Sequence, residues 1–214
     1  MIQAVLFELD GTLADTAADL GYALNCMRAA RSLPSLPLAA TRPYTSLGAR
    51  GLLNVGFDLA PGHGQYTAMR EEFLELYSQN LCRETRLFAG MPELLDAIEA
   101  RGLRWGVVTN KAEGLAVPLL ELLKLGARVG CVIGGDTTGK IKPHPEPLFA
   151  ASRAMAIAPQ HCVYVGDDVR DIEAGRAAGM KVIAVRYGYL NGSNPDTWNA
   201  DAVIDHPLDL LKVL

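Results

Sequence analysis

The 214-residue chain lacks the sequence features that are typical of secreted, zinc-stapled and membrane proteins. It has only four cysteines, which are far apart, with no Cys-x-x-Cys pair and no histidine at zinc-ligand spacing. This spacing predicts reduced thiols rather than disulfides or a zinc site. The N-terminus has no basic leader, and no apolar run approaches the ~20 residues that a membrane-spanning helix needs. We therefore expect a cytoplasmic protein with no membrane partner.

An excess of charge of one sign is also missing. The chain has 20 Lys and Arg against 24 Asp and Glu, a net charge of −4, and both signs are scattered along it. The absence of a basic patch argues against a nucleic-acid partner. Half of the residues, 50%, are apolar, so the chain can bury one core together with a sizeable insertion. The sequence leaves the oligomeric state unknown.

Two regions with different hydrophobic patterns follow each other along the chain. From Thr16 to about Leu87 the pattern is helical, and Thr16 is the expected N-cap of the first helix. A second helix is expected from about Gln65 to Leu81, with its apolar residues on one face. No strand pattern interrupts this region, so it predicts an all-helical block.

From Phe88 onward, helix and strand patterns alternate. Helices are expected over 93–101, 112–123, 145–156 and 170–178, and strands over 105–109, 131–133, 162–165 and 182–185. Together with a buried first strand over 4–7, this alternation predicts right-handed βαβ units. The expected fold class is therefore α/β, with a parallel sheet covered by helices on both faces.

Polar side chains follow three of the expected strands. Glu8 and Asp10 come after the strand over 4–7, Thr109 and Asn110 stand at the end of the strand over 105–109, and Asp167 follows the strand over 162–165. Ligands of open parallel sheets bind at the carboxyl ends of the strands. Each group alone has an ordinary explanation as a turn, a helix cap or a solvated pair. Their shared position favours a site, and carboxylates, a hydroxyl and a lysine are the parts that phosphoryl transfer needs.

Four blocks of the sequence, at 7–16, 107–111, 142–147 and 164–179, resemble in order the four motifs of the haloacid dehalogenase (HAD) superfamily phosphatases. The resemblance covers essentially the whole chain. It implies a Rossmann-like, HAD-like catalytic core formed by residues 1–14 and 88–214. It also implies that residues 15–87 are a helical cap domain, inserted after the first strand, which closes over the site.

The resemblance assigns catalytic roles to Glu8, Asp10, Thr109 and Lys142, and a substrate-binding role to Asn110. It implies a nucleophile at Glu8, which forms an acyl phosphate, and a general acid/base at Asp10. Thr109, with Asn110, would bind the transferring phosphoryl group, and Lys142 would neutralise the charge of the phosphate and the nucleophile. Each of these roles needs a side chain of the type that the sequence has there.

The resemblance also implies a Mg²⁺ cofactor. The carboxylate of Glu8, Asp10 through its backbone carbonyl, and Asp167 would be metal ligands. Asp171 would support the ion through water or a hydrogen bond.

Finer similarities predict the substrate. The segment 163–179 looks like the phosphoglycolate phosphatase branch, which implies a phosphomonoesterase acting on a small phosphorylated metabolite. The tail at 184–189 and 194–201 looks like a proteobacterial sub-branch that includes phosphatases of N-acetylmuramic acid 6-phosphate, which is the alternative substrate. Gly48 would let backbone approach the substrate, and Arg50 could reach a substrate anion.

Glu8 is a departure from the family, whose motif has aspartate at this position. The extra methylene displaces the carboxylate by roughly 1 Å, and misplacement on that scale can cost ~10²-fold in rate. Three interpretations remain: a weakened natural enzyme, an altered chain, and a non-catalytic protein that binds a phosphorylated metabolite. Because the rest of the apparatus is present, we favour a phosphatase with impaired turnover.

Overall fold

A six-stranded parallel sheet forms the centre of the computed structural model, which describes all 214 residues. The strand order is β5-β4-β1-β6-β7-β8. The strands are β1 (Ala4–Phe7), β4 (Arg104–Val108), β5 (Val132–Ile133), β6 (Cys162–Gly166), β7 (Lys181–Val185) and β8 (Ala202–Ile204). This arrangement confirms the predicted fold class. The edge strand β8 was not predicted from the sequence.

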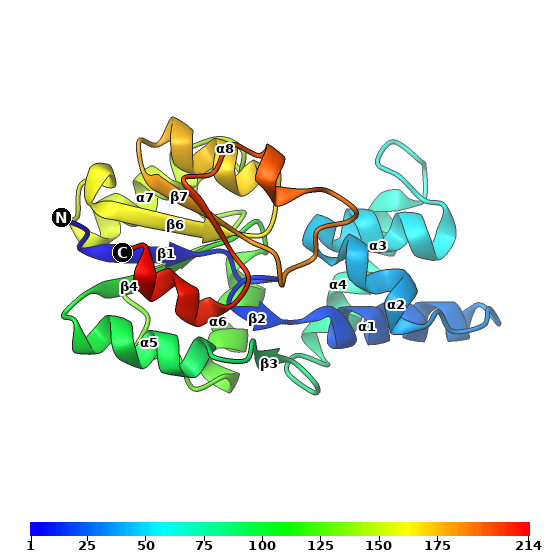
Figure 1. The fold of residues 1–214 in the computed structure, drawn as a ribbon. Helices are drawn as coiled ribbons and strands as arrows, with labels where there is room; N and C mark the ends of the chain where they lie inside the picture. Colours follow the sequence, from blue (N-terminus) through cyan, green and yellow to red (C-terminus); the bar gives the residue numbers. More distant parts are fainter.

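Helices cover both faces of the sheet (Figure 1). On one face lie α5 (Met91–Ala100), α6 (Glu113–Leu122) and the 3₁₀ helix η4 (Pro207–Lys212), and on the other lie α7 (Glu146–Met155) and α8 (Val169–Ala177). Two further 3₁₀ helices are η2 (Pro159–His161) and η3 (Pro195–Thr197). Strand β1 is fully buried because it lies between β4 and β6 and is covered by helices on both faces of the sheet. None of the helices combines the length and the apolarity needed to cross a bilayer.

The remaining helices gather beyond one end of the sheet, in a group that we call the helical layer (Figure 1). It consists of α1 (Ala17–Ala30), α2 (Leu38–Thr41), η1 (Arg42–Leu47), α3 (Gly48–Phe57) and α4 (Tyr66–Ser78). The layer has its own core of nine buried residues, separate from the clusters that cover the sheet. Its two connections to the rest of the chain pair as an antiparallel ribbon of β2 (Ala14–Asp15) and β3 (Arg86–Leu87). The region expected to be all-helical therefore ends in a strand, which is too short to show a period.

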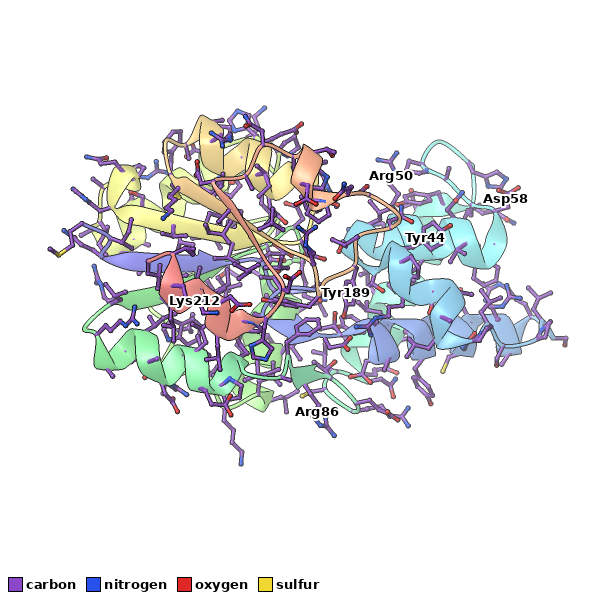
Figure 2. All side chains as sticks on the ribbon, in the orientation of Figure 1. Tyr44, Arg50, Asp58, Arg86, Tyr189 and Lys212 are labelled. Carbon is purple, nitrogen blue, oxygen red and sulfur yellow. The ribbon has the colours of Figure 1, made fainter.

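Thr16 is the N-cap residue of α1, as predicted, but its side chain does not cap the helix, and a residue distant in sequence does so instead. Thr16 precedes the helix, but its hydroxyl donates to Asp10 Oδ1 at 2.6 Å. The hydroxyl of Tyr189 instead accepts hydrogen bonds from the backbone N–H of Thr16, at 2.7 Å, and of Ala17, at 3.0 Å. It donates to Asp15 Oδ1 at 2.7 Å. Tyr189 therefore ties the helical layer to the core at the place where they meet (Figure 2).

Replacing Tyr189 by phenylalanine should destabilise the protein by about 1–3 kcal/mol, because it leaves the buried N–H of Thr16 without an acceptor and that of Ala17 with only Asp15 Oδ1 at 3.4 Å. Urea denaturation followed by circular dichroism would measure the change. Tyr22→Phe is the matched control, since Tyr22 is an exposed tyrosine of α1 at 41% exposure and should lose almost nothing. Equal stability of the two variants would show that the hydroxyl of Tyr189 does not support the helix.

Candidate active site

The site lies at the carboxyl ends of three adjacent strands. Phe7 at the end of β1 is in register with Val107 in β4 and with Val165 in β6. The residues that follow therefore emerge at one edge of the sheet, and this brings Glu8 beside Thr109 and Lys142. The sequence predicted from strand ends alone that Glu8 and Thr109 would meet, whereas Lys142 comes from the segment between β5 and α7.

Glu8 is held by two donors. Its Oε1 accepts a hydrogen bond from Thr109 Oγ1 at 2.8 Å, and its Oε2 is paired with the Lys142 ammonium. The residue is buried, with 8% exposure. Burial raises the pKa of Glu8 to about 7, and although Lys142 opposes the shift, the nearby Asp171 and Asp10 add to it. The Glu8 carboxylate is therefore already bound to the Thr109 hydroxyl and the Lys142 ammonium, the two groups that were predicted to bind a phosphoryl group.

Lys142 is a buried cation at the centre of the site. Its Nζ also donates to Asp171 Oδ1 at 2.7 Å and to the Tyr164 hydroxyl at 2.5 Å. Burial alone would lower the pKa of Lys142, but Asp171 and Glu8 outweigh burial and raise the pKa, so the side chain stays an ammonium. The Asn110 amide pairs with the backbone of Lys142, at 3.0 Å and 3.1 Å. Asn110, predicted to bind phosphate, therefore positions the lysine loop in this structure.

Asp10 is fixed at both carboxylate oxygens. Oδ1 accepts from Thr16 Oγ1 at 2.6 Å, and Oδ2 forms an ion pair with Lys111 Nζ at 3.1 Å. Lys111 in turn donates to the Tyr77 hydroxyl at 3.1 Å, and Tyr77 comes from α4 of the helical layer. The acid that was predicted to be the general acid/base is thus held by groups from both parts of the molecule.

Asp167 is buried and shared by three donors. Its Oδ1 accepts from Thr12 Oγ1 at 3.0 Å, and its Oδ2 accepts from Ser46 Oγ and from the Tyr189 N–H, both at 2.8 Å. Burial raises the pKa of Asp167 to about 8, with a further contribution from Asp171, while the Tyr189 N–H and the Ser46 hydroxyl lower it. Because Ser46 lies in η1, the helical layer touches the core at this predicted metal ligand.

The donor set fits a divalent cation by its chemistry. The site holds more carboxylates than cationic groups: the carboxylates are Glu8, Asp10, Asp167, Asp168 and Asp171, and the cations are Lys111, Lys142 and Arg170. Burial is the main cause of the raised pKa values of Glu8 and Asp167, and neighbouring carboxylates add to it. Carboxylate oxygens are the ligands that Mg²⁺ prefers. No three acidic, histidine or cysteine side chains are arranged around one point, however, because each carboxylate faces its own donors. The predicted four-residue metal set stays a prediction, and Asp171 in this structure is a partner of Lys142.

A cavity of about 270 Å³ opens between the catalytic edge and the helical layer. Glu8 and Asp10 lie at one side of it, and its apolar wall includes Leu20, Leu47, Phe73, Leu74 and Leu115. Two exposed arginines, Arg50 in α3 and Arg70 in α4, also line the cavity, and neither forms an ion pair. Gly48 lines it as well, with a φ of +57° at the start of α3. The structure therefore places both predicted substrate-binding residues of the helical layer at this cavity.

Sequence reasoning missed several residues that organise the site. Arg170 pairs with Asp168 and donates to the backbone oxygen of Ser46 at 2.9 Å, which joins the core to the helical layer. Tyr164, Thr12 and Lys111 were missed too. The available signal was that all these residues stand inside the motif blocks at 7–16, 107–111 and 164–179, next to residues that were assigned roles.

Comparisons with known proteins show what this chain is similar to in sequence and in structure. A family model described as haloacid dehalogenase-like hydrolase matches residues 5–185. The N-acetylmuramic acid 6-phosphate phosphatase of Pseudomonas putida is 44% identical over 214 residues, which is 100% of this chain and 96% of that protein. A phosphoglycolate phosphatase of Xanthomonas campestris is 43% identical over 209 residues, covering 97% and 94%. The crystal structure of a predicted phosphoglycolate phosphatase from Haemophilus somnus has a TM-score of 0.88 at 27% identity, covering 99% and 97%.

Proposed function

The chain belongs to the haloacid dehalogenase-like hydrolase family, and within it we propose that it is a Mg²⁺-dependent phosphomonoesterase acting on a small phosphorylated metabolite. The family match confirms the resemblance predicted from the four motif blocks. The observation that carries the proposed reaction is one contact set: the position-8 carboxylate lies against both a buried ammonium, Lys142, and a hydroxyl, Thr109.

The proposed reaction has two steps. In the first, the position-8 carboxylate attacks phosphorus, the bond from phosphorus to the ester oxygen breaks, and Asp10 donates a proton to the departing oxygen. In the second, Asp10 takes a proton from water, the water oxygen attacks the acyl phosphate, and inorganic phosphate leaves with the carboxylate restored. Splitting the reaction in this way replaces one difficult step by two easier ones.

The surrounding residues handle the charge of the phosphate. Lys142 and Thr109 would hold phosphoryl oxygens in line with the attack once the carboxylate releases them. Mg²⁺, the ion that phosphatases of this family generally use, would reduce the repulsion between the phosphate and the carboxylates when bound by Asp167, the position-8 carboxylate and Asp10. These ligand and phosphate-binding roles belong to the proposal.

We propose that residues 15–87 act as a cap over a core of residues 1–14 and 88–214. The separate core of the helical layer and its two-stranded connection support this division. The contacts of Ser46 and Arg170 place the layer against the catalytic edge, where it would exclude water from the acyl phosphate. A cytoplasmic location remains a prediction.

The cavity favours the larger of the two substrates that the relatives' names suggest. Phosphoglycolate has only two carbon atoms besides its phosphate, so it would leave most of the apolar wall without a contact. A phosphorylated sugar acid, such as N-acetylmuramic acid 6-phosphate, offers a ring for the wall and a carboxylate for Arg50 or Arg70. We therefore propose a substrate of this class ahead of phosphoglycolate.

Phosphate release tests both levels of the proposal. The chain should hydrolyse p-nitrophenyl phosphate with Mg²⁺ and stop when the ion is chelated. Its kcat/KM should be higher for N-acetylmuramic acid 6-phosphate than for phosphoglycolate, and the reverse order would restore phosphoglycolate as the substrate. Tight binding of either compound with no release of phosphate, also after Glu8→Asp, would instead establish a non-catalytic binding protein.

Replacing Arg50 by alanine should lower kcat/KM for the sugar-acid phosphate by about tenfold or more and spare p-nitrophenyl phosphate, because only the former has an anion for the helical layer to bind. Arg70→Ala tests the second arginine in the same way. Arg83→Ala is the matched control, since Arg83 lies outside this cavity. If both substrates lose the same factor, Arg50 is structural or part of the phosphate site.

A further inference from the structure

The Asp10 carboxylate is held at both oxygens by groups that are connected to the helical layer. Thr16, which fixes Oδ1, directly precedes α1. Lys111, which fixes Oδ2, belongs to the core, but its ammonium reaches the Tyr77 hydroxyl on α4 at 3.1 Å. The contact of Tyr77 with Lys111 is the only link of this second path to the helical layer, and neither residue has a role in the reaction described above.

The packing around Tyr77 and Lys111 restricts these two side chains to one conformation. Tyr77 is fully buried in the core of the helical layer, so its ring cannot move without disturbing α4. The Lys111 side chain is 6% exposed, and its Nζ lies 4.4 Å from the centroid of the Tyr77 ring as well as within reach of the hydroxyl. A buried lysine without these partners would be costly, and a flexible four-carbon stem would not keep one position by itself.

We propose that Tyr77 and Lys111 are positioning residues that orient the Asp10 carboxylate toward the leaving-group oxygen. Asp10 then has this orientation only while the helical layer is packed against the core. The inference depends on the proposed phosphomonoesterase reaction, in which Asp10 protonates that oxygen. Tyr77 fixes the ammonium, the ammonium fixes Oδ2, and the position of α4 is thereby transmitted to the acid. A substrate that brings the helical layer against the core would orient Asp10 for proton donation in the same conformational change.

Two substrates that differ in their need for a proton test this role. The alkoxide of an alkyl phosphate such as glycerol 2-phosphate leaves only when it is protonated, whereas p-nitrophenolate is stable without a proton. The ratio kcat/KM reports the steps up to departure of the leaving group, so it isolates the acid from the later attack of water. Tyr77→Phe removes only the hydroxyl and keeps the ring, which spares the packing of α4.

We expect Tyr77→Phe to lower kcat/KM about tenfold for glycerol 2-phosphate and by less than about threefold for p-nitrophenyl phosphate, since a poorly aimed acid loses part of its ~10²-fold or larger contribution. Lys111→Met should show the same selectivity, and the double variant should lose no more than Lys111→Met alone, because the hydroxyl acts through the ammonium. Tyr22→Phe, at an exposed tyrosine elsewhere in the layer, is the control and should change neither substrate.

An equal loss on both substrates, an additive double variant, or no loss at all would overturn the proposal. All measurements are repeated with Glu8→Asp, which keeps the assay informative if the natural chain is slow. If neither substrate is hydrolysed even then, the phosphomonoesterase function itself fails. That outcome is distinct from an active enzyme whose Tyr77 variant shows no selectivity. The melting temperature of each variant shows whether a loss of activity comes from misorientation of Asp10 or from unfolding of the protein.

Discussion

Replacing Glu8 by aspartate should raise phosphatase turnover by about 10²-fold or more, because misplacement of a reacting group by roughly 1 Å costs on that scale. The structure adds a reason beyond distance. The longer glutamate side chain reaches Thr109 and Lys142 and takes the hydroxyl and the ammonium that a phosphoryl group would need. Shortening the side chain withdraws the carboxylate and frees both donors for the substrate. The measurement is steady-state release of phosphate from p-nitrophenyl phosphate with saturating Mg²⁺.

The controls separate the length of the side chain from its charge. Glu8→Asn has nearly the shape of Glu8→Asp but is a poor nucleophile, so it should remain inactive while melting at a similar temperature. Glu8→Gln keeps the length and removes the charge, and it too should be inactive. If Glu8→Asp turns over no faster than the natural chain, the site is organised around the longer acid and the account of impaired turnover is wrong.

Asp167→Asn should weaken Mg²⁺ binding by about tenfold or more, because the substitution keeps the shape of the side chain and removes a charged ligand. Burial, with a smaller contribution from Asp171, raises the pKa of Asp167 to about 8, so a bound cation would offset the cost of burying this charge. Isothermal titration of the protein with MgCl₂ measures the affinity directly and does not depend on turnover.

The matched control for Asp167→Asn is Asp205→Asn. The side chain of Asp205 is 78% exposed and pairs with Arg186 at 3.0 Å, and it makes no contact with the proposed ligands. Its loss should leave Mg²⁺ affinity within about twofold, because the interaction of exposed charges is weak and screened. Unchanged affinity in Asp167→Asn would remove Asp167 from the proposed ligands, and an equal loss in both variants would show only a general effect of charge.

Local patterns in the sequence were sufficient to predict the framework of the catalytic edge. Apolar runs flanked by turns identified most of the central strands, and alternation of helix and strand implied a parallel sheet. From that inference alone, Glu8, Thr109 and Asp167 had to meet, because the carboxyl ends of adjacent parallel strands lie at one edge. This reasoning needs only the hydrophobic periodicity within about ten residues and the rule that adjacent parallel strands end at the same edge of the sheet.

Contacts between residues distant in sequence were decided only by the tertiary structure. Nothing near Tyr189 shows that its hydroxyl caps α1, and nothing near Tyr77 shows that it reaches Lys111. The same holds for the direction of each carboxylate, which follows the donors packed around it and not its neighbours in the chain. Sequence periodicity determined which side chains reach the site, because a strand or a helix sets their direction locally. Packing between the helical layer and the core determined what each of them touches, because those partners are joined through space and not along the chain.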